Sequence, residues 1–220
     1  MPNYVRNRLT IYASVEDCEK VMNTILNEKD ELDFNKIIPM PEDLAIDSSS
    51  DGDLGVSYIK GTLTDCEKER FEKFSPERKK EVIELGKQYI NNLVKYGFET
   101  WYEWRIQNWD TKWNAIGTII YNNIIEFDTA WSAPIAIYEK LGEMFPNISF
   151  SFIYADEDVS YNVGEGGMKN GEFTLYCPEG GTKEAFEMFC EVQGDCLFIW
   201  DEEKNCPKYI EKEDEDEDEI

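Results

Sequence analysis

The stretch Tyr4-Val5-Arg6-Asn7-Arg8-Leu9-Thr10-Ile11-Tyr12 begins the chain with alternating side chains. Its valine, leucine and isoleucine fall on one side of an extended backbone, and its arginines and threonine fall on the other. Because successive side chains of a strand point to opposite faces, this pattern predicts a half-buried strand. Ser14 follows as a helix cap, with Asp17 three residues later and apolar residues at helical spacing up to Leu26. The sequence therefore predicts a β-α unit at its start.

Three further helices are predicted from their caps. The longest begins at Ser75-Pro76-Glu77, where a capping serine precedes a proline suited to the first helical position, and it ends at Gly97. Another begins at Pro134 and stops before Pro146. Thr182 caps a last, short helix.

Strands are predicted where β-branched and aromatic residues gather in the second half of the chain. The run 118–127 is rich in isoleucine and predicts a buried strand, with Asn122-Asn123 as a bulge or a turn. Residues 148–154 predict the next strand, and residues 197–200 predict a last one. Helices and strands thus alternate irregularly, as in an α+β protein.

Two glycine-containing segments are predicted to form a hairpin and a long loop. Residues 161–163 and 172–176 flank Gly164-Glu165-Gly166-Gly167, which predicts a hairpin with the glycines in its turn. Residues 33–64 lose periodicity among prolines, serines and glycines, so we expect a long loop there with one short strand at 56–59.

The formal net charge is −25, from 47 acidic and 22 basic side chains. Residues 211–219 carry eight acids and one lysine, so a net charge of −18 belongs to the rest of the chain. A field of this sign repels phosphate backbones and favours basic partners, and we therefore expect no direct binding of nucleic acid. Residues 211–220 cannot bury enough apolar area to offset their ordering entropy, so we expect a disordered acidic tail.

The chain contains no histidine. This excludes the Ser-His-Asp and Cys-His nucleophile designs and the HExxH metal site, and it favours a non-enzymatic protein without metal or cofactor. The start of the chain lacks a secretory signal, and no apolar run approaches the roughly 20 residues that span a bilayer. We therefore expect a cytoplasmic protein with no membrane partner. The six cysteines, Cys190 and Cys196 among them, are expected to be reduced structural thiols.

Five motifs lie between residue 2 and about residue 165. They are Pro2-Asn3-Tyr4-Val5-Arg6-Asn7 with Leu9 and Ile11; Phe34-Asn35-Lys36-Ile37-Ile38-Pro39-Met40-Pro41; Trp101-Tyr102-Glu103-Trp104-Arg105 leading to Asn108-Trp109-Asp110-Thr111-Lys112-Trp113-Asn114; Phe127-Asp128-Thr129-Ala130-Trp131-Ser132; and Tyr154-Ala155-Asp156-Glu157-Asp158. In order and character they resemble the YubB-type ferredoxin-like family, a set of uncharacterised phage, prophage and plasmid proteins. The resemblance implies a ferredoxin-like β-α-β-β-α-β core with a helical insertion and a C-terminal extension, and it implies no established activity.

We expect this fold to form one elaborated domain over residues 1–210. The long loop and the longest helix then make up an insertion at about residues 33–114.

The tryptophan-rich region is the first candidate site. Five of the six tryptophans lie between residues 101 and 131 beside cationic, amide and carboxylate side chains, which together could form an aromatic pocket with convergent polar groups. The alternative is that the indoles fill core space while Lys112 or Arg105 pairs with Asp128. The candidate ligand-binding residues are Trp101, Trp104, Arg105, Asn108, Trp109, Lys112, Trp113, Asn114, Asp128 and Trp131.

Acidic clusters are the second candidate, as a surface for a basic or nucleic-acid-binding protein. The partner-binding candidates are Asp156, Glu157, Asp158, Glu211, Glu213, Asp214 and Glu215. Our leading hypothesis is a non-enzymatic protein of a phage, plasmid or prophage that acts in counter-defence. Such a protein would mimic DNA by presenting carboxylates in place of phosphates. The alternative is a small-ligand-binding protein, a sponge or an enzyme, that uses the tryptophan-rich pocket with Arg105 or Lys112 as an anion clamp.

Overall fold

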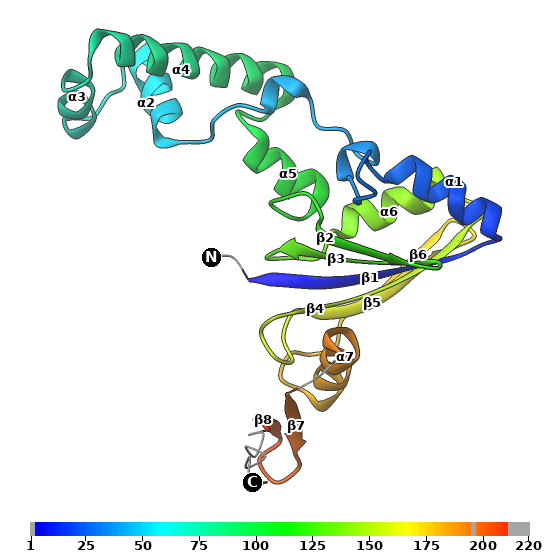
Figure 1. The fold of residues 1–220 in the computed structure, drawn as a ribbon. Helices are drawn as coiled ribbons and strands as arrows, with labels where there is room; N and C mark the ends of the chain where they lie inside the picture. The colour runs from blue at the N-terminus through cyan, green and yellow to red at the C-terminus, as the bar shows by residue number, and fades with distance from the viewer. Residues whose placement is uncertain (1–2, 195–196, 211–220) are drawn as a thin grey trace, which may run out of the picture. The chain divides into compact units, whose positions relative to one another are not determined.

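The structure is a computed structural model that describes residues 3–194 and 197–210 (Figure 1). The chain forms two compact units. Residues 1–37 and 113–220 form the first, which we call the sheet unit, and residues 38–112 form the second, which we call the helical unit.

The sheet unit is built on a six-stranded antiparallel sheet with the order β2-β3-β1-β4-β5-β6. Its strands are β1 (Tyr4–Tyr12), β2 (Ile116–Tyr121), β3 (Ile124–Ala130), β4 (Ser149–Asp156), β5 (Val163–Lys169) and β6 (Glu172–Tyr176), and its helical segments are α1 (Val15–Ile25), η1 (Phe34–Lys36), α6 (Ile135–Met144) and α7 (Lys183–Gln193). Strands β7 (Phe198–Asp201) and β8 (Cys206–Tyr209) pair as a separate ribbon. The succession β1-α1-β2-β3-α6-β4 is the ferredoxin-like β-α-β-β-α-β arrangement, so the predicted fold class is confirmed.

The two faces of the sheet are covered differently. Helices α1 and α6 lie on one face and α7 lies on the other (Figure 1). The side chain of Tyr138 on α6 stacks on Phe152 of β4, with 4.2 Å between the ring centroids. On the opposite face, α7 packs Ala185, Phe189 and Val192 into a cluster with β4 and β5. We call the face that carries α7 the open face, because one helix covers it only in part.

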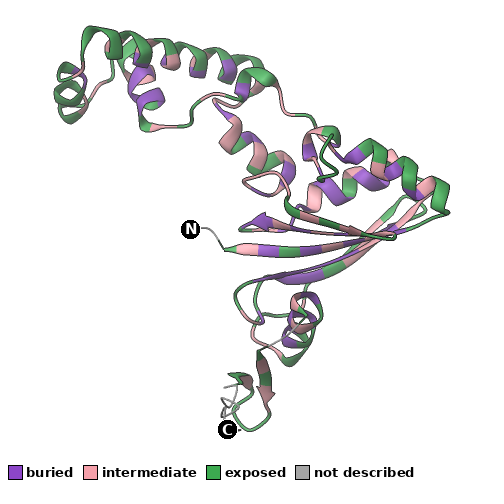
Figure 2. Cartoon of the chain, viewed as in Figure 1, coloured by how far each residue is buried: buried purple, intermediate pink, exposed green. Residues whose placement is uncertain are grey.

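Strand β1 occupies the centre of the sheet, as its alternation predicts. Val5, Leu9 and Ile11 are fully buried. Figure 2 shows buried stretches alternating with more exposed ones along β1. Asn7 shares their side and is also fully buried, so its amide needs partners inside the protein. Its Nδ2 donates to Thr129 Oγ1 at 3.0 Å, and its Oδ1 accepts from the Tyr138 hydroxyl at 2.9 Å. The amide therefore links two strands to α6.

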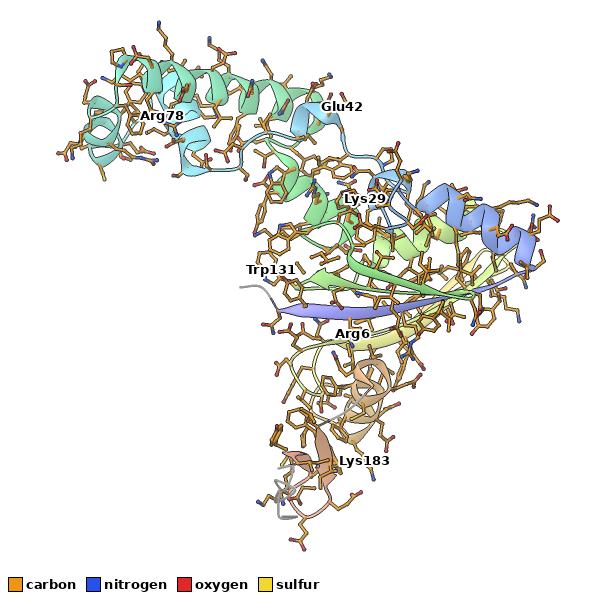
Figure 3. The ribbon with its side chains drawn as sticks, viewed as in Figure 1. Arg6, Lys29, Glu42, Arg78, Trp131 and Lys183 are labelled. Carbon is orange, nitrogen blue, oxygen red and sulfur yellow. The ribbon has the colours of Figure 1, made fainter. Side chains whose placement is uncertain are left out.

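The helical unit contains η2 (Glu42–Leu44), α2 (Ser50–Lys60), α3 (Asp65–Glu72), α4 (Pro76–Tyr96) and α5 (Trp101–Trp109). Helix α4 begins and ends as predicted: Ser75 Oγ accepts from the Arg78 amide, and Gly97 closes the helix in a left-handed conformation. Asp51 on α2 is buried and pairs with both Arg70 and Arg78, which ties α2 to α3 and α4 (Figure 3).

Helices α2 and α4 cross at two glycines. A Cβ placed on Gly55 would lie 2.1 Å from the Val82 carbonyl oxygen, and one placed on Gly86 would lie 2.3 Å from the Gly55 carbonyl carbon. Neither position has room for a side chain, so the two backbones touch directly. Residues 50–60 are a helix rather than the predicted loop and strand, because the glycines that weaken helix propensity permit this close packing.

Other predictions need correction. Residues 164–167 lie within β5, and the turn of the hairpin falls at Asn170 and Gly171 instead. Glycine is required in that strand because a Cβ on Gly164 or Gly166 would overlap the rings of Tyr154 and Phe152. The run 118–127 is two strands, β2 and β3, joined by a turn at Asn122 and Asn123. Helices α3 and α5 and strand β8 were not predicted. Cys190 forms a disulfide, so the expectation that every cysteine is reduced is wrong there.

Candidate functional site

The ten tryptophan-region candidates fall in both units. Six of them, from Trp101 to Lys112, belong to the helical unit, and the other four belong to the sheet unit.

In the helical unit, the indoles pack around one arginine. Thr100 caps α5, and its three tryptophans follow at intervals of three to five residues. The guanidinium of Arg105 lies 5.0 Å from the ring centroid of Trp101 and 4.9 Å from that of Trp109. Trp109 is fully buried and its Nε1 donates to the Ile38 carbonyl oxygen at 2.9 Å. These contacts hold the arginine between two aromatic faces.

The environment of Arg105 is uncommon in so acidic a chain. Its Nε is buried without a hydrogen-bond partner, and among the described residues its guanidinium pairs with no carboxylate. Burial lowers the pKa of Arg105 because the charged form loses solvation.

The other candidates on this unit serve local structure. Trp104 meets Trp109 edge to face, with 5.7 Å between the centroids. Asn108 Nδ2 donates to the Trp104 carbonyl oxygen of its own helix at 2.8 Å, and Lys112 Nζ lies 5.4 Å from the Tyr102 ring centroid.

In the sheet unit, the candidates lie in different surroundings. Asn114 holds the loop before η1, since its Oδ1 accepts from the Phe34 amide and its Nδ2 donates to Asp33, both at 2.8 Å. Asp128 lies on β3 opposite Arg6, with 3.7 Å between the carboxylate and the guanidinium Nε. Burial raises the pKa of Asp128, and Arg6 opposes this only in part. The predicted pairing of Asp128 with Arg105 or Lys112 is thus replaced by Arg6.

Trp113 and Trp131 complete this group. Trp113 is the first residue of the second segment of the sheet unit. Trp131 is 43% exposed and has a left-handed backbone, and its amide donates to the Asn3 carbonyl oxygen at 2.9 Å (Figure 3).

Among the acidic candidates, one is buried and has a structural role, and others are exposed at the surface. Asp156 is buried, and its carboxylate accepts from Asn3 Nδ2 at 3.1 Å, Asn162 Nδ2 at 2.8 Å and the Asp158 amide at 3.0 Å. It is therefore a structural residue that cannot meet a partner. Glu157 and Asp158 are exposed. The candidates Glu211, Glu213, Asp214 and Glu215 lie outside the described residues.

A longer acidic stretch of the chain extends beyond these candidates. Residues 156–203, which we call the acidic segment, contain 13 acidic side chains and two lysines. Within it, α7 buries its apolar side against the sheet and exposes Glu184, Glu187 and Glu191. Lys183 at the start of α7 is already paired with Glu202 (Figure 3). The spacing of the three glutamates was visible in the sequence, but only the packing of α7 shows that they face solvent.

Few of these carboxylates have a cationic partner. Among residues 3–194 and 197–210, the ion pairs that involve the acidic segment are Lys183 with Glu202 and Arg8 with Glu191. Seven exposed glutamates of the segment form no ion pair within the described residues: Glu157, Glu165, Glu172, Glu179, Glu184, Glu187 and Glu203. Their charge is available to a partner.

The described part of the chain, residues 3–194 and 197–210, shows neither a membrane-spanning helix nor a cluster of metal ligands. In that part of the chain, no helix is both long and apolar enough to cross a membrane. Nor does that part bring three or more histidine, cysteine, aspartate or glutamate side chains together where they could hold a metal ion.

A comparison with protein-family models agrees with the fold. Residues 108–194 match a family model described as "Ferredoxin-like domain in Api92-like protein". This segment is thus similar to Api92-like proteins, whereas the YubB name stays a prediction. A crystal structure of a protein Api92 from Yersinia pseudotuberculosis is 10% identical, with a TM-score of 0.42, and the alignment covers 81% of this chain and 99% of that one. The comparison with curated proteins gave no match.

Proposed function

We propose that this protein is a non-enzymatic factor that binds a basic or nucleic-acid-binding protein through the acidic segment. The observation that carries the proposal is the uneven placement of charge. The acidic segment has a net charge of −11 over residues 156–203, whereas the helical unit has 15 acidic and 11 basic side chains over residues 38–112. A chain that used acidity only for solubility would spread it over both units.

The exposed carboxylates favour a protein partner over a small ligand. Glu157, Glu179 and Glu187 are solvated and unpaired within the described residues, and they do not surround a common cavity. Carboxylates in such an array raise the association rate of a cationic surface and repel nucleic acid. In its most specific form, the proposal is that the array substitutes for phosphates on a host protein in counter-defence, as the resemblance to proteins of mobile elements suggested.

An affinity capture from host lysate tests the proposal, with the full chain as bait at low and at high salt. We expect a nucleic-acid-handling protein to be retained at low salt, released as salt rises, and displaced by added duplex DNA. Retention that neither salt nor DNA changes would contradict the proposal.

Matched variants make the test specific. Replacing Glu157, Glu179 and Glu187 with glutamine should weaken retention about tenfold, because three unpaired charges are removed. Replacing three exposed glutamates of the helical unit, Glu42, Glu69 and Glu77, changes the net charge equally and should have less than about a twofold effect. Equal effects of both triple variants would mean that only net charge matters.

Deletion of residues 211–220 tests the tail separately. We expect weaker association, because eight acids are lost, with the thermal midpoint changed by less than about 1 °C. Unchanged association would restrict the interface to residues 1–210.

A second candidate function rests on Arg105. A half-buried guanidinium with an unsatisfied Nε, stacked between two indoles, suits a small anion that carries a planar ring. Adenosine monophosphate is a suitable probe for calorimetry. Arg105→Met should abolish its binding while preserving the unfolding curve, and Lys112→Met should weaken it less. An unfolded Arg105→Met variant would instead assign the arginine to packing.

A further inference from the structure

The open face of the sheet carries a groove beside α7. The strand registers place Glu126, Arg8, Ile153, Glu165 and Tyr176 in one row across β3, β1, β4, β5 and β6, in that order. The next row on the same face consists of Ile124, Thr10, Ser151, Gly167 and Thr174. Helix α7 covers the neighbouring part of this face, over Ala155 and Val163. Ile153 of the first row also lies under α7, and the uncovered region consists of the other residues of the two rows, most of which line cavities.

Two adjoining cavities occupy this uncovered region. One has a volume of about 680 Å³ and includes Arg8, Ser151, Glu165 and Tyr176 in its wall. The other has a volume of about 590 Å³ and includes Ser149, Gly167 and Lys169. Tyr12 and Thr174 line both, so the two form one continuous groove.

The floor of the groove carries several hydroxyl groups among apolar side chains. Thr10, Ser151 and Thr174 provide hydroxyl groups, and Gly167 leaves the floor open between them. The Cβ that Gly167 lacks would lie 2.6 Å from the Phe150 carbonyl oxygen, so no larger residue fits there. Such a floor can receive the backbone of an extended segment.

The walls combine aromatic rings with carboxylates. Tyr12 is 58% exposed and Tyr176 is 48% exposed, which leaves ring faces open to a ligand. Glu165 and Glu191 line the larger cavity, and Glu172 lines the smaller one. Tyrosine faces with carboxylates nearby are suited to arginine and lysine side chains.

The two cations already in the groove wall, Arg8 and Lys169, offset the charge of its glutamates only in part. Arg8 donates through Nε to Glu126 at 2.8 Å and through Nη2 to the Glu191 carbonyl oxygen at 3.3 Å. Its Nη1 lies 3.9 Å from the Glu191 carboxylate, beyond hydrogen-bond distance. Glu165 and Glu172 have no ion pair within the described residues.

We propose that this groove binds an extended segment of a partner protein that carries arginine or lysine at alternate positions. Side chains of one face of an extended segment recur about every 7 Å, which lets successive cations reach the carboxylates along the groove. Charge disfavours nucleic acid and the chain's own acidic tail as occupants. The proposal rests on the proposed function and adds the binding surface and the chemistry of the bound segment.

A fluorescence-polarisation titration tests it with a labelled decapeptide of alternating arginine and serine, at about 50 mM and about 300 mM salt. Glu165→Gln with Glu191→Gln should weaken binding about tenfold. The matched control is Glu19→Gln with Glu28→Gln, two exposed glutamates without ion pairs in the described residues, one on α1 and one just after it. It removes the same charge and should have less than about a twofold effect.

Two further variants, one that leaves the charge unchanged and one that adds a positive charge, test whether binding depends on the groove itself or only on net charge. Tyr176→Ser retains every carboxylate and should weaken binding about fivefold through loss of the ring face. Thr174→Lys places a resident ammonium at an exposed position of the floor and should compete with the peptide without disturbing the core.

The outcomes distinguish the two proposals. If both glutamine pairs weaken binding equally and Tyr176→Ser has no effect, the groove proposal is wrong while the acidic segment can still bind a basic protein. If the unaltered protein binds no cationic peptide at either salt concentration, both proposals fail. Each variant's unfolding curve shows whether lost binding reflects lost structure.

Discussion

The two units use their carboxylates in different ways. In the helical unit, Asp51 is clamped by Arg70 and Arg78, and Asp43 pairs with Lys95, whose pKa is raised chiefly by that hydrogen bond. In the sheet unit, the comparable buried carboxylate is Asp156, and its partners are two asparagine amides and a backbone N–H.

This difference follows from the supply of cations. The acidic segment has two lysines for 13 acids, so the buried carboxylate of Asp156 takes neutral donors, and most of the exposed carboxylates have no ion pair within the described residues. The helical unit has nearly enough lysine and arginine to pair its acids internally. Charge therefore stabilises the structure of one unit and remains available for binding on the other.

The largest effect is expected from Gly86→Leu, which tests whether the units are stable independently. The new side chain must separate α2 from α4, at a cost of about 3 kcal/mol. Hydrogen exchange should show faster exchange in residues 38–112 and little change in β1 to β6.

Lys80→Leu introduces the same side chain at an exposed position of α4 and serves as the control. Faster exchange throughout both units would show that they unfold together. The two units would then differ in how they use charge but not in stability.

Asp156→Asn is expected to destabilise the sheet unit by about 2 kcal/mol, because one carboxylate oxygen becomes an NH₂ group facing other donors. Urea unfolding measures the loss, and it should not depend on salt. The exposed neighbour Asp158→Asn is the control. A loss that disappears at high salt would mean that Asp156 acts through charge.

Asp51→Asn should destabilise the helical unit by about 1 kcal/mol, less than Asp156→Asn destabilises the sheet unit, because the arginine partners of Asp51 are about half exposed. Unlike the cost of Asp156→Asn, this cost should shrink as salt rises. Asp53→Asn, an exposed change on the same helix, provides the reference. A salt-independent loss would remove the proposed contrast between the two buried carboxylates.

The smallest expected effect is the contribution of Glu126 to the pH dependence of stability. Burial tends to raise its pKa, but hydrogen bonds from Tyr121 and Arg8 outweigh burial and hold the pKa below the ordinary value of 4.5. A lowered carboxyl pKa contributes stability above the unfolded-state pKa and loses it as pH falls through the folded-state pKa.

Glu126→Gln should therefore lower stability by less than about 1 kcal/mol at pH 7 and flatten the decline below about pH 4.5. Unfolding curves at a series of pH values measure both changes. Asp128→Asn is the contrasting variant, since burial raises the pKa of that carboxyl and gives the opposite pH dependence. If Glu126→Gln lost stability below about pH 4.5 as steeply as the unaltered protein, Glu126 would not be the source of this pH dependence.

Elements with strong local signals were predictable. The alternation of side chains predicts strand β1, and capping residues predict the starts of α1, α4 and α7. These elements are predictable because caps and periodicity depend on a few neighbouring residues. Helix α2 and strand β5 were mispredicted for one shared reason. Their glycines satisfy contacts with residues distant in sequence, and a local pattern cannot show those contacts.

The candidate sites show the same limit. The sequence located the tryptophans and the acids, but it grouped Asp128 with Arg105, whereas the strand register pairs Asp128 with Arg6. It also treated Asp156 as a surface residue, although two asparagines enclose it.

The sequence by itself determined the acidity, the absence of histidine and the α+β character, since these follow from composition and from local pattern. Only the tertiary structure decided which carboxylates are buried, which are paired, and that hydroxyls, tyrosines and glutamates from several strands line one groove. The physical reason is that charge and local conformation are properties of short segments, whereas a surface is formed by strand register and helix packing between segments far apart in the chain.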